Sequence, residues 1–206
     1  MLIIQHRINT TQDLSKVPPD RGVELDLRED GSRLVLQHDP CRGGEDFENY
    51  LKHYKHAFMV VNIKSEGLEE LALPLLRKYA VKDYFFLDLS LPALVRCMRA
   101  KQKNIAVRFS EYESFEQCLT FKDKAKWVWV DCFHGVPYGL RDYSHLAKHF
   151  KLCIVSPELQ GYSTRHIGTF RKALSGYRID AICTKYPKAW IRLPWESHSE
   201  KSHSAG

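Results

Sequence analysis

Several motifs that identify common protein classes are missing from this sequence. Its six cysteines form no Cys-x-x-Cys pair, so the usual spacing of a structural zinc site is absent. No apolar run approaches the roughly 20 residues that a membrane-spanning helix needs. The apolar start is too short for a signal peptide. No Gly-x-Gly-x-x-Gly motif follows the first apolar stretch, which argues against a dinucleotide-binding fold.

A strong clustering of charge is missing as well. The formal net charge is +6, and the basic residues are scattered along the chain. This balance predicts no nucleic-acid partner but suits a small anionic substrate. Several cysteines fall in apolar patterns, where a thiol behaves as a core residue, so we expect a reducing, cytoplasmic compartment. The composition predicts one domain over residues 1–196 and a disordered polar tail over residues 197–206.

The sequence does contain a regular alternation of strand and helix patterns. Strand patterns are centred near residues 3, 25, 61, 87, 107, 129, 154 and 182. Helical patterns are expected over residues 67–79, 91–101, 114–121, 140–150 and 164–175. This succession predicts a compact α/β fold of the (β/α)8 TIM-barrel type, with an open doubly wound sheet as the alternative. Turn residues 29–32 predict a small β-hairpin that returns over residues 34–38.

Acidic, amide and imidazole side chains gather at the ends of the first predicted strands. His6 ends the first strand, and Glu24 and Asp26 lie two residues apart on one face of the second. Asn62 and Lys64 repeat this spacing on the third strand. Carboxylates on an apolar strand face are costly unless they are paired or bind a cation. The pattern predicts a metal-assisted site at the carboxyl ends of the strands.

Polar residues at the later strand ends have more ordinary explanations. Asp131, His134 and Glu158 are each expected to be solvated loop residues or helix caps. Arg108 ends the fifth strand and is a candidate for a further phosphate contact.

The ordered motifs of the first third of the chain resemble those of the glycerophosphodiester phosphodiesterase family, within the phospholipase-C-like phosphodiesterase barrels. Members of that family carry His-Arg-Gly at the first strand, Glu-x-Asp at the second, His-Asp shortly after, and Glu-x-Lys on the third. The matching residues in this sequence are His6-Arg7, Glu24-x-Asp26, His38-Asp39 and Asn62-x-Lys64.

Two residues depart from the family pattern. Ile8 stands where the family has glycine, so the backbone after Arg7 loses conformations that glycine prefers. Asn62 stands where the family has an acid, and its amide offers an oxygen ligand without charge. Sphingomyelinase-D-type barrels also lack the glycine, although their resemblance to this chain is thinner.

The resemblance implies a metal-assisted phosphodiester hydrolase. His6 and His38 would be the acid and base, because imidazole titrates near neutral pH. The implied cofactor is a divalent cation, Mg²⁺ or Ca²⁺. The implied ligands of the cation are Glu24, Asp26 and Asn62, and the implied phosphate-binding residues are Arg7, Lys64 and Arg108.

Other activities remain open on the sequence. A catalytically weakened barrel that binds a phosphorylated ligand or a partner protein is one alternative, and Ile8 and Asn62 favour it. A sphingomyelinase-D-like phosphodiester lyase is another. The expected substrate is a small phosphodiester, and no stable membrane insertion is expected. No sequence pattern indicates the head group or the oligomeric state. None distinguishes attack by water from release of a cyclic phosphate.

Overall fold

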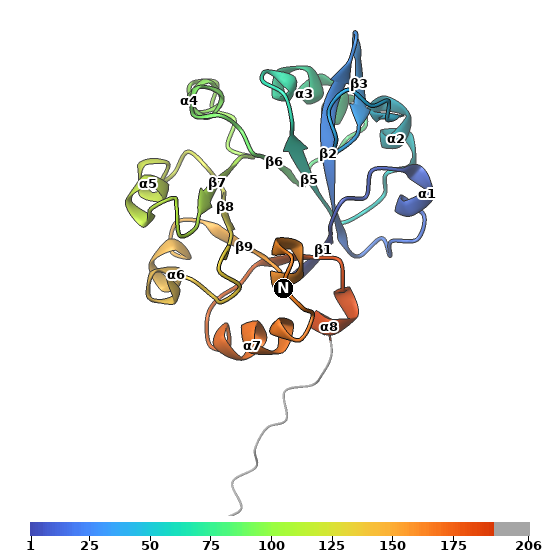
Figure 1. The fold of residues 1–206 in the computed structure, drawn as a ribbon. Coiled ribbons are helices and arrows are strands. Elements are labelled where there is room, and N and C mark those ends of the chain that lie inside the picture. Colours follow the sequence, from blue (N-terminus) through green and yellow to red (C-terminus); the bar gives the residue numbers. More distant parts are fainter. Residues whose placement is uncertain (192–206) are drawn as a thin grey trace, which may run out of the picture.

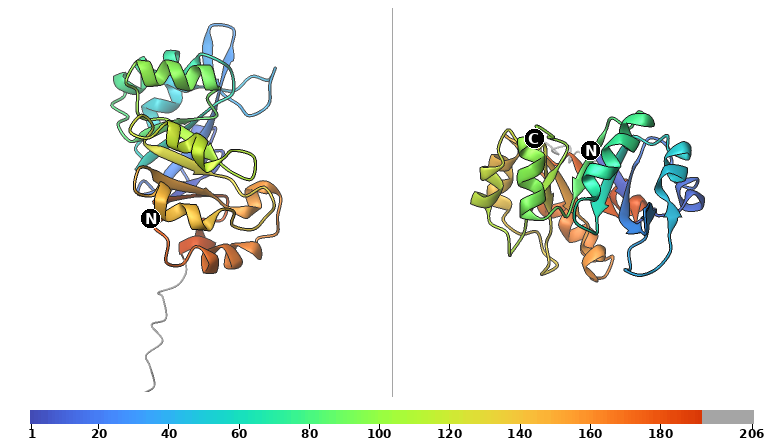
Figure 2. Two further views of the ribbon diagram at one scale, coloured as in Figure 1. Left: turned by 90° about the vertical axis from the view of Figure 1, so that its left-hand side faces the viewer. Right: turned by 90° about the horizontal axis from the view of Figure 1, so that it is seen from above.

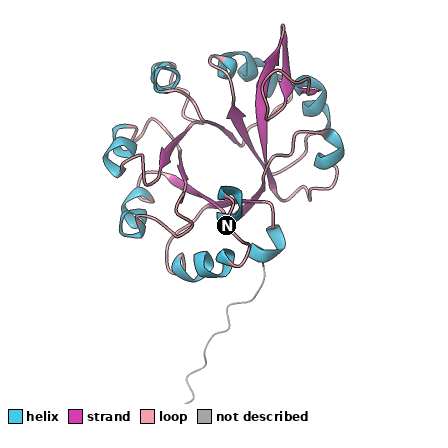
Figure 3. Ribbon diagram, viewed as in Figure 1, coloured by secondary structure: helices cyan, strands magenta, loops and turns pink. Residues whose placement is uncertain are grey.

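Eight parallel strands form a curled sheet at the centre of the molecule, with helices around its outside (Figures 1 and 3). The computed structural model describes residues 1–191. The strands coincide with the eight predicted strand patterns. They are β1 (Leu2–Gln5), β2 (Gly22–Asp30), β5 (Phe58–Ile63), β6 (Tyr84–Leu87), β7 (Ala106–Phe109), β8 (Trp127–Val130), β9 (Lys151–Val155) and β10 (Ala181–Thr184).

The order of the strands follows a nearly closed path. Continuous parallel pairing runs from β6 through β5, β2, β1, β10, β9 and β8 to β7. β6 and β7, at the two ends of this path, share one isolated parallel bridge between Phe86 and Ile105. We call this junction the β6–β7 seam. The structure therefore confirms an α/β fold with a curled eight-stranded parallel sheet, and the seam is its weakest junction.

Eight α-helices in residues 1–191 cover the sheet, as the side and top views show (Figure 2). The five predicted helices are present, and α4 begins where the Ser90 side chain accepts a hydrogen bond from the Ala93 amide. The short α1, α2 and α8 were not predicted. The helices are α1 (Thr11–Leu14), α2 (Phe47–His53), α3 (Leu68–Lys78), α4 (Leu91–Arg99), α5 (Phe115–Thr120), α6 (Leu140–Leu146), α7 (His166–Ala173) and α8 (Pro187–Ile191), with a 3₁₀ turn η1 (Pro157–Gln160) after β9.

The predicted hairpin is confirmed at the end of β2. Strand β3 (Arg33–Leu36) pairs antiparallel with the last residues of β2, and the two-residue β4 (Glu45–Asp46) pairs with β3. The hairpin extends beyond the other strands at the top of Figure 1. Its position matters for the site because His38 lies two residues after the end of β3.

Strand alternation divides the buried side chains into two groups. Val23 and Leu25 on β2 pack against the helices, as do the outward-facing residues at every second position of the other strands. A smaller cluster fills the inside of the curled sheet, where the Phe85 ring lies 5.7 Å from Phe58 and 5.1 Å from Trp127. Cys153 and Cys183 belong to this inner cluster, and burial raises their pKa values. These two cysteines therefore act as core residues, as the sequence predicts.

No helix within residues 1–191 is long and apolar enough to cross a bilayer. The predicted polar tail, residues 197–206, lies outside the described residues.

Candidate active site

Glu24 and Asp26 lie side by side on the inner face of β2, and each residue is 1% exposed. Asp26 is in register with Asn62 on the neighbouring β5. The Asn62 amide nitrogen donates to Glu24 Oε1 at 3.0 Å. The structure thus brings together the three residues that the resemblance implies as cation ligands.

Glu24 is held by two further groups from the segment after β1. The Arg7 backbone amide donates to Glu24 Oε2 at 2.7 Å, and His6 Nε2 lies 3.8 Å from the same oxygen. Burial, and then the charge of Asp26, raise the pKa of Glu24 to about 7. A cation beside these two carboxylates would favour the charged form of both.

Asp26 is surrounded by cations and by an amide. Lys64 Nζ lies 3.4 Å from Asp26 Oδ1, and Arg7 Nε lies 3.5 Å from Oδ2. Asn9 donates to Oδ2 at 2.9 Å and accepts from the Asp26 backbone amide at 2.8 Å. Sequence reasoning missed Asn9, because no pattern distinguishes one polar loop residue from its neighbours.

His6 is placed where a neutral imidazole is favoured. Its side chain is 17% exposed, and its Nδ1 is buried without a hydrogen-bond partner. Burial lowers the pKa of His6 to about 4, and the charges of Arg7 and Lys185 add to this effect. The ring is therefore neutral at physiological pH and can accept a proton.

The low pKa of His6 has a consequence for stability. Below pH 6.5 the unfolded chain binds a proton at His6 that the folded protein takes up only near pH 4, so folding loses free energy as pH falls. Between pH 7 and 5, wild type should lose about 2 kcal/mol more than His6→Gln. Urea denaturation of both proteins at several pH values measures this difference. Parallel losses in the two proteins would contradict it.

His38 lies on the hairpin side of the site. Its Nδ1 is 2.9 Å from Asp39 Oδ1, and its backbone carbonyl accepts from Arg28 Nε at 2.9 Å. Among the described residues, no hydrogen bond or ion pair joins His38 to Glu24 or Asp26. The imidazole is oriented by Asp39 but stands apart from the buried carboxylates.

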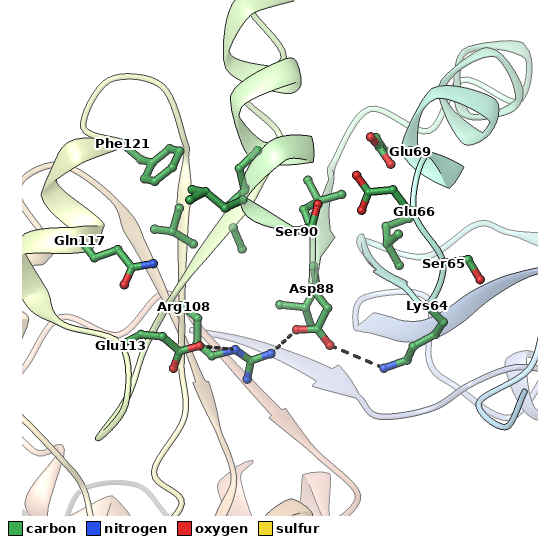
Figure 4. Close-up of a pocket in the computed structure, with 17 residues that line it drawn as sticks. Lys64, Ser65, Glu66, Glu69, Asp88, Ser90, Arg108, Glu113, Gln117 and Phe121 are labelled. Atoms are coloured by element: carbon green, nitrogen blue, oxygen red, sulfur yellow. Dashed lines mark hydrogen bonds and ion pairs between the residues drawn. The ribbon is translucent and has the colours of Figure 1, made fainter.

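Arg108 and Lys64 belong to one chain of ion pairs (Figure 4). Lys64 Nζ lies 3.6 Å from Asp88 Oδ2, and Asp88 also contacts Arg108. Arg108 contacts Asp131 and lies 3.4 Å from Glu113 Oε1. Three carboxylates therefore surround the guanidinium, and a phosphate group at Arg108 has to replace at least one of them.

Asp88 was missed by sequence reasoning, although it follows the strand that ends at Leu87. It has a φ of 59°, which is uncommon for a non-glycine residue. Its position at a strand end, on the same edge as Lys64, was the available signal.

Two expectations for the later strand ends are wrong. Asp131 is 1% exposed and accepts from Gln160 Nε2 at 2.6 Å, because it continues the inward-facing positions of β8. Glu158 is half-buried and accepts from Thr184 Oγ1 at 2.6 Å. His134, with a side chain that is 64% exposed, is solvated as expected.

The charges at this end of the sheet do not balance. The carboxyl groups outnumber the cations by two in the connected group of Arg7, Lys64, Arg108, Glu24, Asp26, Asp88, Glu113 and Asp131, and the raised pKa of Glu24 leaves that one group partly protonated near pH 7. A phosphodiester is itself an anion, so a divalent cation would offset the repulsion that the substrate meets here.

Glu24, Asp26 and Asn62 are suitable ligands for a hard divalent cation, but their combined charge is low for such an ion. Asn62 Oδ1 is buried without a hydrogen-bond partner and is a free oxygen ligand beside Glu24. Within residues 1–191, however, no three His, Cys, Asp or Glu side chains converge on one point. Two carboxylates and one amide oxygen form a donor set with less charge than such an ion prefers.

Comparison with known proteins adds evidence on the fold. No protein-family model matches the sequence, and no curated protein is similar enough to count as a relative. A glycerophosphodiester phosphodiesterase from Agrobacterium tumefaciens str. C58 superposes with a TM-score of 0.68 at 14% identity, over 92% of this chain and 99% of that one. A candidate glycerophosphodiester phosphodiesterase from Galdieria sulphuraria gives 0.69 at 16% identity, over 91% and 95%. The chain therefore has the fold of these two proteins over nearly their whole length.

Proposed function

We propose that this protein is a phosphodiester hydrolase of the glycerophosphodiester type, built on a (β/α)8 barrel that closes at the β6–β7 seam. The observation that carries the proposal is the neutral His6 imidazole beside two buried carboxylates and the cations Arg7 and Lys64. The fold shared with glycerophosphodiester phosphodiesterases supports it.

Each side chain has a role that follows from its surroundings. Arg7 and Lys64 lie against Asp26 and would bind the non-bridging phosphate oxygens when substrate arrives. The His6 ring would accept the proton of the attacking hydroxyl. His38, oriented by Asp39, would return a proton to the leaving oxygen.

Mg²⁺ or Ca²⁺ would be held by Glu24, Asp26 and the Asn62 amide oxygen. When bound, the ion supplies positive charge that stabilises the phosphoryl group as its negative charge increases.

The uncharged Asn62 should set the affinity for the cation. Replacing Asn62 with Asp adds a carboxylate to the donor set, so Mg²⁺ and Ca²⁺ should bind about 10-fold more tightly or better. Titration calorimetry measures this affinity directly. Asn49→Asp on the exposed face of α2 is the control and should bind like wild type. Equal affinities for Asn62→Asp and wild type would contradict the ligand assignment.

Turnover of simple phosphodiesters tests the proposal. We expect hydrolysis of bis(4-nitrophenyl) phosphate and of glycerophosphodiesters, lowered by a chelator, and little hydrolysis of 4-nitrophenyl phosphate, a monoester. Product analysis by ³¹P NMR separates direct hydrolysis from cyclic phosphate release. An absence of diester turnover at any pH and with either ion would overturn the proposal.

A non-catalytic, phosphate-binding protein is the second candidate. The observation that favours it is the complete pairing of Arg108, which three carboxylates surround. Calorimetry would then show binding of phosphodiesters that are never cleaved.

A further inference from the structure

Seven lysines that are scattered along the sequence gather on one surface of the folded chain. They occupy three consecutive connections, from α4 to β7, from α5 to β8 and from α6 to β9, within residues 100–105, 121–126 and 147–151. Helices α4, α5 and α6 follow one another around one side of the curled sheet, so these connections are neighbours (Figure 1). We call this surface the lysine face, and its lysines are Lys101, Lys103, Lys122, Lys124, Lys126, Lys148 and Lys151.

Backbone hydrogen bonds hold lysines from the three connections side by side. The Lys126 amide donates to the Lys103 carbonyl at 3.0 Å, and the Lys151 amide donates to the Lys126 carbonyl at 2.8 Å. These residues stand at the starts of adjacent strands, which lie about 4.8 Å apart in a sheet. Like charges at neighbouring positions repel one another, and an anionic partner would relieve that repulsion.

The lysine face has almost no compensating negative charge. All seven lysines are exposed, and over residues 1–191 no ion pair joins any of them to a carboxylate. Asp123 is the single acidic residue of the three connections, so their formal charge equals the +6 of the whole chain. The excess positive charge of the protein is therefore concentrated on this surface.

The lysine face lies at the opposite end of the strands from the candidate active site. Lys126 immediately precedes β8, and Asp131 directly follows its last residue, Val130. A strand of this length separates the two by roughly 15 Å. Carboxyl groups are in excess around Asp131, so an anionic surface would attract one end of the molecule and repel the other. A partner on the lysine face leaves the active site open.

The chemistry of the lysine face favours a diffuse anionic surface over nucleic acid. Its aromatic residues Trp127, Phe121 and Phe150 are 4%, 6% and 3% exposed, so they offer no ring on which a base could stack. The three connections contain no arginine, the residue that binds phosphate and guanine with two parallel hydrogen bonds. Lysines act as point charges, and clusters of roughly four to eight basic residues are typical of proteins that bind anionic phospholipids.

We propose that the lysine face binds the surface of a membrane that contains anionic phospholipids and turns the candidate active site toward the solution. The contact is peripheral, because none of the large apolar side chains exposed within residues 1–191 belongs to these connections. Since the attraction is between point charges and a charged plane, it depends on the charge density of the membrane and not on one head group.

Vesicle binding tests the proposal. The probes are vesicles of phosphatidylcholine alone, and of phosphatidylcholine mixed three to one with phosphatidylserine or with phosphatidylglycerol. Sedimentation measures the fraction of protein bound. The protein should bind both kinds of anionic vesicle equally well and should not bind phosphatidylcholine alone. It should be released at about 0.5 M NaCl, because salt screens the charges.

The three lysines at the strand starts should carry much of the affinity. Each lysine near an anionic membrane contributes about fivefold, so replacing Lys103, Lys126 and Lys151 together with Gln should weaken binding by about 100-fold. Circular dichroism and the urea midpoint verify that this triple variant is folded.

A second triple variant separates the lysine face from the overall charge. Lys52, Lys172 and Lys188 are exposed on α2, α7 and α8, and replacing all three with Gln lowers the net charge by the same amount. This control should bind anionic vesicles nearly as tightly as wild type. Equal weakening by the two triple variants would overturn the proposal, because net charge alone would then explain the binding.

Two further results would overturn it. One is equal binding to neutral and anionic vesicles. The other is tighter binding to a nucleic acid duplex than to anionic vesicles at the same salt and phosphate concentration, measured by fluorescence anisotropy, which would make nucleic acid the partner. None of these measurements uses diester hydrolysis, so their outcome does not depend on the proposed function.

Discussion

Replacing His6 with alanine should lower kcat for phosphodiester hydrolysis by about 100-fold or more. Within residues 1–191, His6 is the one imidazole that lies within 4 Å of a buried carboxylate of the site, and burial lowers its pKa to about 4, so the ring is neutral near pH 7. Because the ring removes a proton in the reaction but contributes little to substrate binding, KM should change much less than kcat. Initial rates over a range of diester concentrations measure both constants.

The matched control is His53→Ala. His53 is exposed at the end of α2, and its Nδ1 donates one hydrogen bond to the Asn49 carbonyl. It should leave kcat unchanged. Circular dichroism and the urea midpoint verify that His6→Ala is folded. A folded His6→Ala with full activity would remove His6 from the mechanism.

Phe85→Ala should lower the free energy of unfolding by about 3–5 kcal/mol. Phe85 is fully buried inside the curled sheet, where its ring contacts Phe58, Trp127 and Trp129. These three large neighbours are fixed on two strands, β5 and β8, and cannot all move in to fill the space, so most of the cavity should remain. Urea denaturation followed by tryptophan fluorescence measures the loss.

Tyr112→Ala is the control, because that aromatic side chain is 73% exposed and should cost less than 1 kcal/mol. A loss below about 1 kcal/mol for Phe85→Ala would show that the inner cluster adds little stability. Such a result would also shift the main source of stability to the packing between sheet and helices.

The strand order and the first half of the site could be predicted because they depend on local patterns. Alternation placed Glu24 and Asp26 on one face, and register with β5 then put Asn62 beside them. The helices with strong amphipathic periodicity were predicted for the same reason. The four-residue α1 was not, since a single turn has too few positions to show a period.

Contacts across the site could not be predicted, because they depend on how far the sheet curls. Asp131 was expected to be solvated; its inward direction follows from the alternation of β8, but its contacts with Arg108 and Gln160 depend on how closely the neighbouring elements approach. The bridging role of Asp88 likewise depends on the distance between β5 and β7. Sequence patterns give the direction of a side chain, but they do not give such distances.

The single bridge between β6 and β7 also has a mechanical meaning. A ring of strands that is hydrogen-bonded all the way round resists deformation everywhere, whereas a ring with one weakly paired junction can widen or narrow at that junction. Residues of α3, α4 and α5 line the gap at this junction, so the packing of these helices, together with the single bridge, holds β6 and β7 in place. Substitutions on those helices can therefore widen or narrow this gap while leaving Glu24 and Asp26, on the opposite side of β5, in place.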